Sequence, residues 1–205
     1  MNLMLYLLLV QIEKFYQQKG VMGMRTVCKA FRQFKGCMGA EYSTCMIPSY
    51  FATASVPILQ SYQFVSIFNQ MHFVCGAGLQ IYLNNEACMS QAWSGETGNM
   101  LNACRYKFEM SSNAATSSQD VFLNASDGRA NAIVTIRCVI VMSFHLCSLA
   151  NTYTSCFEQQ FQQSCGTSSR DSQFWGCEYA RVNIFTRYPQ CDVSCVCEST
   201  FFIYK

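Results

Sequence analysis

Residues 138–156 read CVIVMSFHLCSLANTYTSC, and the spacing of their cysteines is the most informative feature of the chain. The three cysteines follow one another at steps of nine residues, at Cys138, Cys147 and Cys156. Residues 37–45, CMGAEYSTC, resemble the second of these steps, and Cys28 lies nine residues before Cys37. Both blocks place a tyrosine and two hydroxyl residues directly before the last cysteine. The duplicated spacing predicts two pseudo-repeated halves.

A step of nine residues limits how these cysteines can pair. Nine residues turn an α-helix through about 900°, so the two ends point to opposite sides. A disulfide needs Cα atoms within about 7 Å, so one unbroken helix cannot join Cys138 to Cys147. Between Cys28 and Cys37, either the helix stops, for which Gly36 is the candidate, or each cysteine reaches a different neighbour. We expect cysteines to mark the points where helices cross.

Apolar residues recur at steps of three and four in three segments, which predicts a mainly α-helical domain cross-linked by disulfides. The segments are residues 24–34, 64–82 and 174–185, and Pro189 follows the third. Residues 139–141 read VIV, so a strand at that point is the alternative.

Residues 110–131 are rich in Ser, Asn and Ala and contain no cysteine, which is typical of a surface loop or linker. We therefore expect one cysteine-rich domain, 24–197, with halves at about 24–108 and 132–197. Each half has few apolar residues with which to form a core of its own, so packing of the two halves against each other would bury a shared core.

The cysteine content indicates an oxidising compartment. The chain has fourteen cysteines, an even number, with 51% hydrophobic and only 13% charged residues. Disulfides persist outside the cytosol and restrict the unfolded chain, which suits such a composition. All fourteen are disulfide candidates: Cys28, Cys37, Cys45, Cys75, Cys88, Cys104, Cys138, Cys147, Cys156, Cys165, Cys177, Cys191, Cys195 and Cys197. Their connectivity stays open.

The duplication extends beyond the first two blocks. Cys75 and Cys88 enclose twelve residues, and Cys177 and Cys191 enclose thirteen. Four cysteines have no counterpart in the other copy, namely Cys104, Cys165, Cys195 and Cys197. These four are candidates for bonds that tie the halves together.

Residues 1–10, MNLMLYLLLV, form an apolar block that favours a signal peptide over about 1–20. The match is imperfect, because Lys14 and Lys19 follow the block and no basic residue precedes it. The alternative is an N-terminal helix that packs on the core. A second apolar stretch, 133–150, is interrupted by Arg137 and His145 and suits a buried helix better than a bilayer span of about twenty residues. We expect no membrane association beyond a cleaved signal.

Charge and motifs argue against several functional classes. The net charge is +2 without a basic run, so we expect no nucleic acid partner. Cys191, Cys195 and Cys197 lack a second pair with zinc-like spacing, so we expect no metal. His72 and His145 lie on apolar segments, where core or helix-surface positions are the better interpretation. The chain has no Gly-x-Ser-x-Gly, Walker or dinucleotide glycine motif, and we predict no catalytic residue and no cofactor.

Two short motifs are candidate modification sites. Asn124-Ala-Ser126 is an N-glycosylation sequon in the expected linker. Ser94-Gly95-Glu96 is a weak candidate for glycosaminoglycan attachment, and a turn after Trp93 is its alternative interpretation.

The spaced cysteines on helical stripes resemble the nematode secreted domains of the chondroitin proteoglycan 4 type, and a related nematode family of secreted domains of unknown function. The matching pieces are residues 28–45, 138–156, Cys165-Gly166 and 177–191, which together span about 28–195. The resemblance implies an extracellular matrix or eggshell component, and it carries over no active-site residue.

The first functional hypothesis is a secreted, disulfide-rich structural or interaction protein without enzymatic activity, which has an extracellular protein or glycan as its partner. The second is an extracellular binding module for a lipid or other apolar small molecule, because the many aromatic and methionine side chains could line a cavity. A secreted hydrolase of unfamiliar type is the third.

Overall fold

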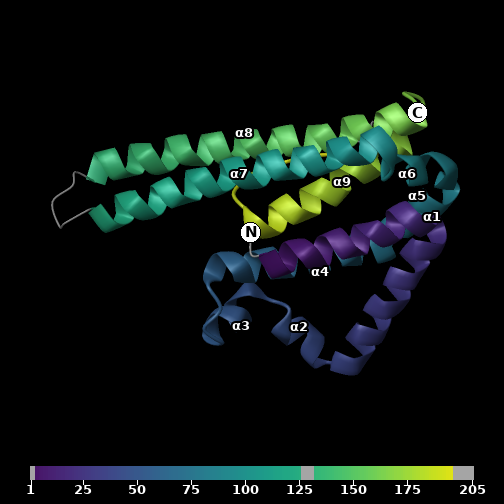
Figure 1. The fold of residues 1–205 in the computed structure, drawn as a ribbon. Coiled ribbons are helices and arrows are strands. Elements are labelled where there is room, and N and C mark those ends of the chain that lie inside the picture. The colour runs from purple at the N-terminus through teal and green to yellow at the C-terminus, as the bar shows by residue number, and fades with distance from the viewer. Residues whose placement is uncertain (1–2, 126–131, 196–205) are drawn as a thin grey trace, which may run out of the picture.

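The computed structural model describes residues 3–125 and 132–195, with side chains from 7 to 114 and from 143 to 195. The described residues form helices and no strand, which confirms the mainly α-helical prediction (Figure 1). The helices are α1 (Leu3–Met38), α2 (Glu41–Cys45), α3 (Pro48–Thr53), α4 (Ile58–Cys75), α5 (Ala77–Asn84), α6 (Glu86–Ala92), α7 (Gly95–Ala125), α8 (Ala132–Cys165) and α9 (Arg170–Arg187). The segment 139–141 is therefore helical.

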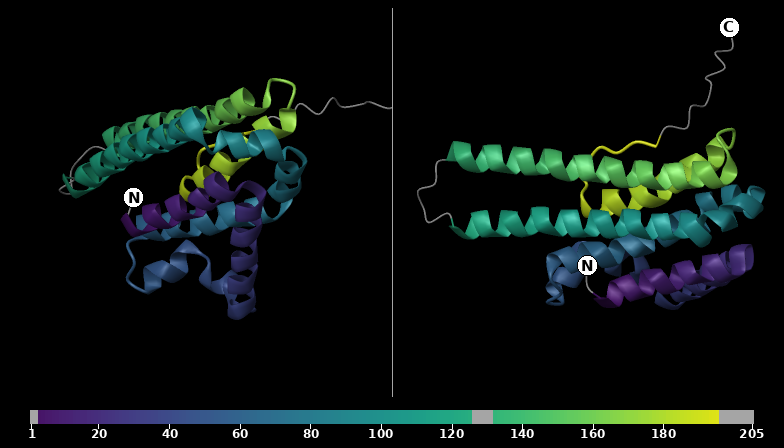
Figure 2. Two further views of the ribbon diagram at one scale, coloured as in Figure 1. Left: turned by 45° about the vertical axis from the view of Figure 1, so that its right-hand side comes forward. Right: turned by 45° about the horizontal axis from the view of Figure 1, so that its top comes forward.

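The helices form two layers. The long helices α7 and α8 lie side by side and antiparallel, as Figures 1 and 2 show. Helix α9 packs against α8 on one side and α4 on the other, and it thereby joins this hairpin to the layer of α1 and α4. The short helices α2 and α3 lie on the far side of α4 (Figure 1).

The linker expected over 110–131 is wrong for residues 110–125, because α7 continues to Ala125. Helix stability in proteins comes mainly from tertiary packing, and α8 offers α7 a partner along its length. The packing of α8 on α7 therefore outweighs the local composition of residues 110–125, which favours a loop. Residues 126–131 lie outside the described part of the chain.

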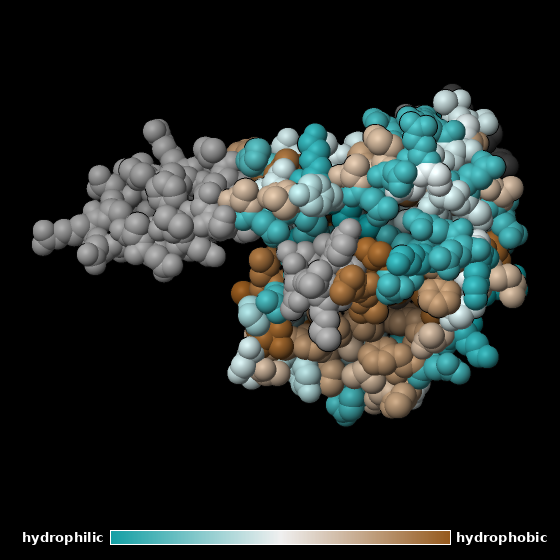
Figure 3. Space-filling view, viewed as in Figure 1, coloured by the Kyte–Doolittle hydropathy of each residue, from teal (hydrophilic) through white to brown (hydrophobic). Residues whose placement is uncertain are grey.

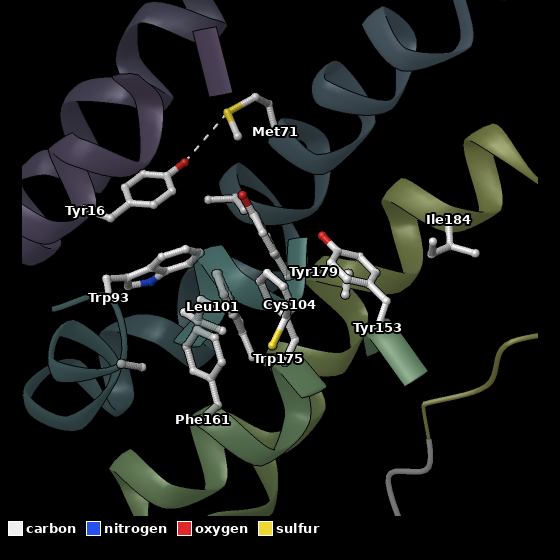
Figure 4. Close-up of a cluster of buried hydrophobic side chains, with 14 of the residues drawn as sticks. Tyr16, Met71, Trp93, Leu101, Cys104, Tyr153, Phe161, Trp175, Tyr179 and Ile184 are labelled. Atoms are coloured by element: carbon white, nitrogen blue, oxygen red, sulfur yellow. Dashed lines mark hydrogen bonds between the residues drawn. The ribbon is translucent and has the colours of Figure 1, made fainter. Parts of the chain in front are cut away.

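Large aromatic side chains fill the space where the two layers meet (Figure 4). Trp175 stacks on Tyr179 with ring centroids 5.3 Å apart, and Trp93 meets Trp175 edge-on at 6.0 Å. The indole N–H of Trp175 donates to the carbonyl of Gly78 at 2.9 Å, which satisfies its one polar atom. A methyl group on Gly78 would lie 2.8 Å from that indole nitrogen, so only glycine fits there.

Two arginine–carboxylate pairs are buried beside this core. Arg105 donates from Nη1 to Glu13 Oε2 at 2.8 Å and from Nη2 to Oε1, and the Tyr179 hydroxyl also donates to Glu13 Oε1, at 2.7 Å. Arg187 pairs with Glu109 in the same bidentate way. Burial by itself lowers the pKa of the Arg105 guanidinium, but Glu13 offsets this and leaves the pKa above its usual value.

Five disulfides join the elements of the chain: Cys28–Cys75, Cys88–Cys165, Cys104–Cys156, Cys147–Cys191 and Cys177–Cys195. The first three join two helices, and the last two tie α8 and α9 to the segment that follows α9. Three of these bonds include a cysteine of α8, and the three cysteines are spaced nine residues apart. Because eighteen residues complete five helical turns, Cys147 and Cys165 face one side of α8 and Cys156 faces the other. The expectation of cross-links between elements is confirmed.

Two of the disulfides tie the first half of the chain to the second. Cys88–Cys165 and Cys104–Cys156 do so, as expected for Cys104 and Cys165. Cys195 instead bonds to Cys177, within its own half. The side chain of Cys138 and all of Cys197 lie outside the described residues.

The first cysteine block differs from the second, because Cys37 and Cys45 are free thiols. Helix α1 does not stop at Gly36 but runs to Met38. Cys28 is buried and bonded to Cys75, whereas Cys37, nine residues later, is exposed on the opposite side of the same helix. Among the described residues, neither Cys37 nor Cys45 is bonded to another cysteine, so the disulfide prediction is wrong for both.

The N-terminal segment, for which the sequence favours a signal peptide, forms the part of α1 before Gly20 in the structure. Leu9 and Tyr16 are 3% and 0% exposed, and Glu13 forms the buried pair with Arg105. This packing corresponds to the alternative of an N-terminal helix on the core. Across the described residues, no helix is both long and apolar enough to cross a membrane.

Candidate functional site

The most distinctive surface feature arises where α1 bends. Gly20 has φ 50° and ψ −129°, which is non-helical and in a region that side chains rarely adopt. The bend divides α1 into a first arm before Gly20 and a second arm after it. A methyl group on Gly23 would lie 1.8 Å from the carbonyl oxygen of Phe15, so glycine lets the two arms approach closely. Together, the two glycines fold the helix back beside α4.

An apolar groove of about 400 Å³ lies between the two arms and α4, and we call it the α1 groove. Its walls include Ile12, Phe15, Phe31, Phe34, Phe68 and Met71. Phe15 and Phe34 are 38% and 36% exposed, so apolar carbon faces solvent inside the groove. Figure 3 shows apolar side chains gathered over the region of α1, α3 and α4 on this face. A concave apolar site of this volume falls within the range of small-molecule sites.

Positive charge borders the α1 groove. The Nζ atom of Lys19 lies 5.7 Å from the centroid of the Phe15 ring. The Nζ atom of Lys35 lies 5.8 Å from the ring of Phe31 and 5.1 Å from that of Tyr42. Neither lysine forms an ion pair within the described residues. A lysine therefore lies against a groove-lining phenylalanine on each arm.

His72 lies beside the second arm and is exposed, as a helix-surface histidine is. Its Nε2 atom is 2.9 Å from the hydroxyl of Tyr42, and its ring meets Phe31 edge-on at 5.0 Å. Burial lowers the pKa of His72 and Lys35 lowers it further, while burial raises the pKa of Tyr42 to about 12. Both groups are therefore mostly neutral near pH 7. The hydrogen-bond partner of His72 is a phenol, which makes its role structural.

The remaining predicted positions lie apart from this groove. His145 is exposed on α8. Ser94 is exposed in the turn between α6 and α7, which confirms the turn after Trp93. Asn124 lies in the last turn of α7, and its side chain is outside the described set. Among the described side chains, no three His, Cys, Asp or Glu residues gather to hold a metal ion, and Cys191 and Cys195 are in disulfides.

The sequence does not predict the α1 groove, because the apolar block at its start favours a signal peptide over about residues 1–20. One third of the residues that line the groove come from that segment, including Ile12 and Phe15. The signal that could have revealed it is the pair Gly20 and Gly23 between two apolar stripes, which is typical of a bent amphipathic helix.

Comparison of the chain with protein-family models, curated proteins and solved structures finds no match. The geometry of the chain itself is therefore the basis for its function.

Proposed function

We propose that this protein is a secreted, disulfide-cross-linked interaction protein without enzymatic activity. The observation that supports this proposal is the set of five disulfides, two of which tie the halves of the chain together. Structural disulfides persist in oxidising compartments and are reduced in the cytosol. The secreted location also agrees with the low content of charged residues, 13%.

The test is a count of free thiols in protein recovered from the medium of secreting cells. Alkylation without reduction should leave at least ten cysteines protected, and alkylation after reduction should label all fourteen. Cys37 should be labelled in both cases, because it is exposed and free. Labelling of all fourteen before reduction, or failure of the chain to leave the cell, would contradict the proposal.

The resemblance to nematode secreted domains would narrow the proposal to a matrix or eggshell component with a protein or glycan partner. N-glycosylation of Asn124 would agree with such an extracellular component. Glycosidase treatment of the secreted protein should increase its electrophoretic mobility, and an Asn124→Gln variant should show no such change. Equal mobility of treated and untreated protein would remove Asn124 from the proposal.

The α1 groove favours a second candidate function, the binding of an apolar small molecule. Its walls are almost entirely carbon, and its volume is about 400 Å³. Ala30 is an exposed groove-lining residue, so Ala30→Trp should fill the groove without disturbing the core. Gln33→Trp, at an exposed position outside the groove, is the matched control. An environment-sensitive apolar dye should bind to the native protein and to the control but not to the Ala30 variant.

A further inference from the structure

We propose that the α1 groove binds a long-chain fatty acid, with its acyl chain along the groove and its carboxylate at Lys35. This inference rests on the second candidate function, the binding of an apolar small molecule. It adds the charge, the number of chains and the orientation of the ligand.

The charge of α1 selects an anion. Its six cations are Lys14, Lys19, Arg25, Lys29, Arg32 and Lys35. Its one acidic residue, Glu13, is buried and held by Arg105, so it does not reduce the positive charge at the surface. Two of the six, Lys19 and Lys35, lie against phenylalanines that line the groove, so negative charge on a ligand is favoured at its border. A neutral apolar molecule would gain no electrostatic attraction from these lysines.

The shape of the groove selects a single chain. Both arms of α1 and helix α4 line it, and Phe15, Phe31 and Phe68 contribute rings from the three walls. Its volume of about 400 Å³ lies at the lower end of the range for small-molecule sites, which suits one acyl chain rather than the two chains of a phospholipid. The rings of Phe31 and Phe68 offer flat apolar walls along the path of such a chain.

Lys35 is the better of the two lysines for holding the carboxylate. It is partly buried, and its Nζ atom lies against the rings of both Phe31 and Tyr42. Lys19 is exposed and lies against one ring only. A partly buried ammonium group without an ion pair gains more from a carboxylate than a solvated one, because water screens it less. The neighbouring Tyr42 and His72 are mostly neutral near pH 7 and do not compete for the charge.

The experiment is a titration of the purified, oxidised protein with a saturated long-chain fatty acid and with the fatty alcohol of equal length. We expect the acid to bind about fivefold more tightly than the alcohol, which corresponds to one partly exposed charge pair. Each methylene removed from the chain should weaken binding about fourfold. Lys35→Met should abolish the preference for the acid, and the matched variant Lys19→Met should retain it. Vesicles with anionic phospholipid should not compete with the free acid.

Different failures have different meanings. Equal binding of acid and alcohol, or an unchanged preference in Lys35→Met, would overturn the inference but leave the groove as an apolar site. If Lys19→Met loses the preference for the acid and Lys35→Met keeps it, the carboxylate does not lie at Lys35 and the proposed orientation is wrong. Tight association with vesicles without uptake of the free acid would replace the ligand by a membrane surface. Binding of neither acid nor alcohol would remove the second candidate function itself. Intact disulfides and unchanged circular dichroism establish that each variant is folded.

Discussion

Glu13 is a buried carboxylate whose position is fixed by partners that come from two distant segments. Arg105 and Tyr179 both donate to it, and they lie 92 and 166 residues away in the chain. A buried charge is tolerated only when it is paired and hydrogen-bonded. Glu13 therefore couples the first arm of α1 to the core, and the fold depends on both members of the pair.

Glu13→Gln should destabilise the protein by about 3–5 kcal/mol, because Arg105 would keep a buried charge without its counter-charge. The control is Glu178→Gln in the partly exposed pair with Arg181, where less than about 1 kcal/mol is expected. Chemical denaturation of both variants measures the difference. Equal losses in the two variants would show that the Glu13 pair is not buried.

Buried tyrosines make the free energy of unfolding depend on pH in the alkaline range. Burial raises the pKa of Tyr153 from 10.0 to about 12. The unfolded chain therefore loses this proton before the folded one, so the contribution to stability is complete below pH 10 and disappears as the pH rises through about 12. A shift of this size corresponds to about 3 kcal/mol. Tyr16 and Tyr179 act in the same direction, since burial raises their pKa values well above the usual one.

We expect the free energy of unfolding to fall between about pH 10 and pH 12. Denaturation curves across this window measure the loss. A Tyr153→Phe variant should lose less stability over the same window than the native protein. A flat profile up to pH 12 would contradict the burial of these phenols.

At the scale of elements, the bend in α1 separates the two arms that form the groove. Gly20→Ala should reduce the free energy of unfolding by about 1–2 kcal/mol or more, because its positive φ is unfavourable for a side chain and a methyl group would meet Ser90 Oγ at 2.9 Å. The same variant should weaken dye binding to the α1 groove.

Gly36→Ala is the matched control on the same helix. Its Cβ would meet no atom within 4 Å, and its φ is not positive. Alanine there should stabilise the protein by about 0.4–1 kcal/mol, because it restricts the unfolded chain. Thermal unfolding distinguishes the two variants, and a stabilising effect of both would mean that α1 is not bent at Gly20.

At the scale of the molecule, the disulfides hold the two halves together. Replacing Cys88 and Cys165 by alanine should lower the free energy of unfolding by about 4 kcal/mol, since the bond closes a separation of 77 residues. Replacing Cys177 and Cys195, only 18 residues apart, should cost about 3 kcal/mol. Cys37→Ser and Cys45→Ser remove free thiols and should change stability by less than about 0.5 kcal/mol. Chemical denaturation compares all four, and a large loss in either serine variant would show that its thiol is bonded.

The helical class, the apolar stripes and the need for cross-links between helices can be predicted from the amino-acid sequence, because periodicity and the step of nine are local properties of a helix. Tertiary structure alone decided which cysteines pair, because pairing depends on which helices face each other, as the free Cys37 and the bonded Cys147 show. It also decided that residues 110–125 are helical and that the first arm of α1 packs on the core. Local composition favoured a linker and a signal peptide there, whereas α8, Arg105 and Tyr179 supply the partners that only the folded chain brings together.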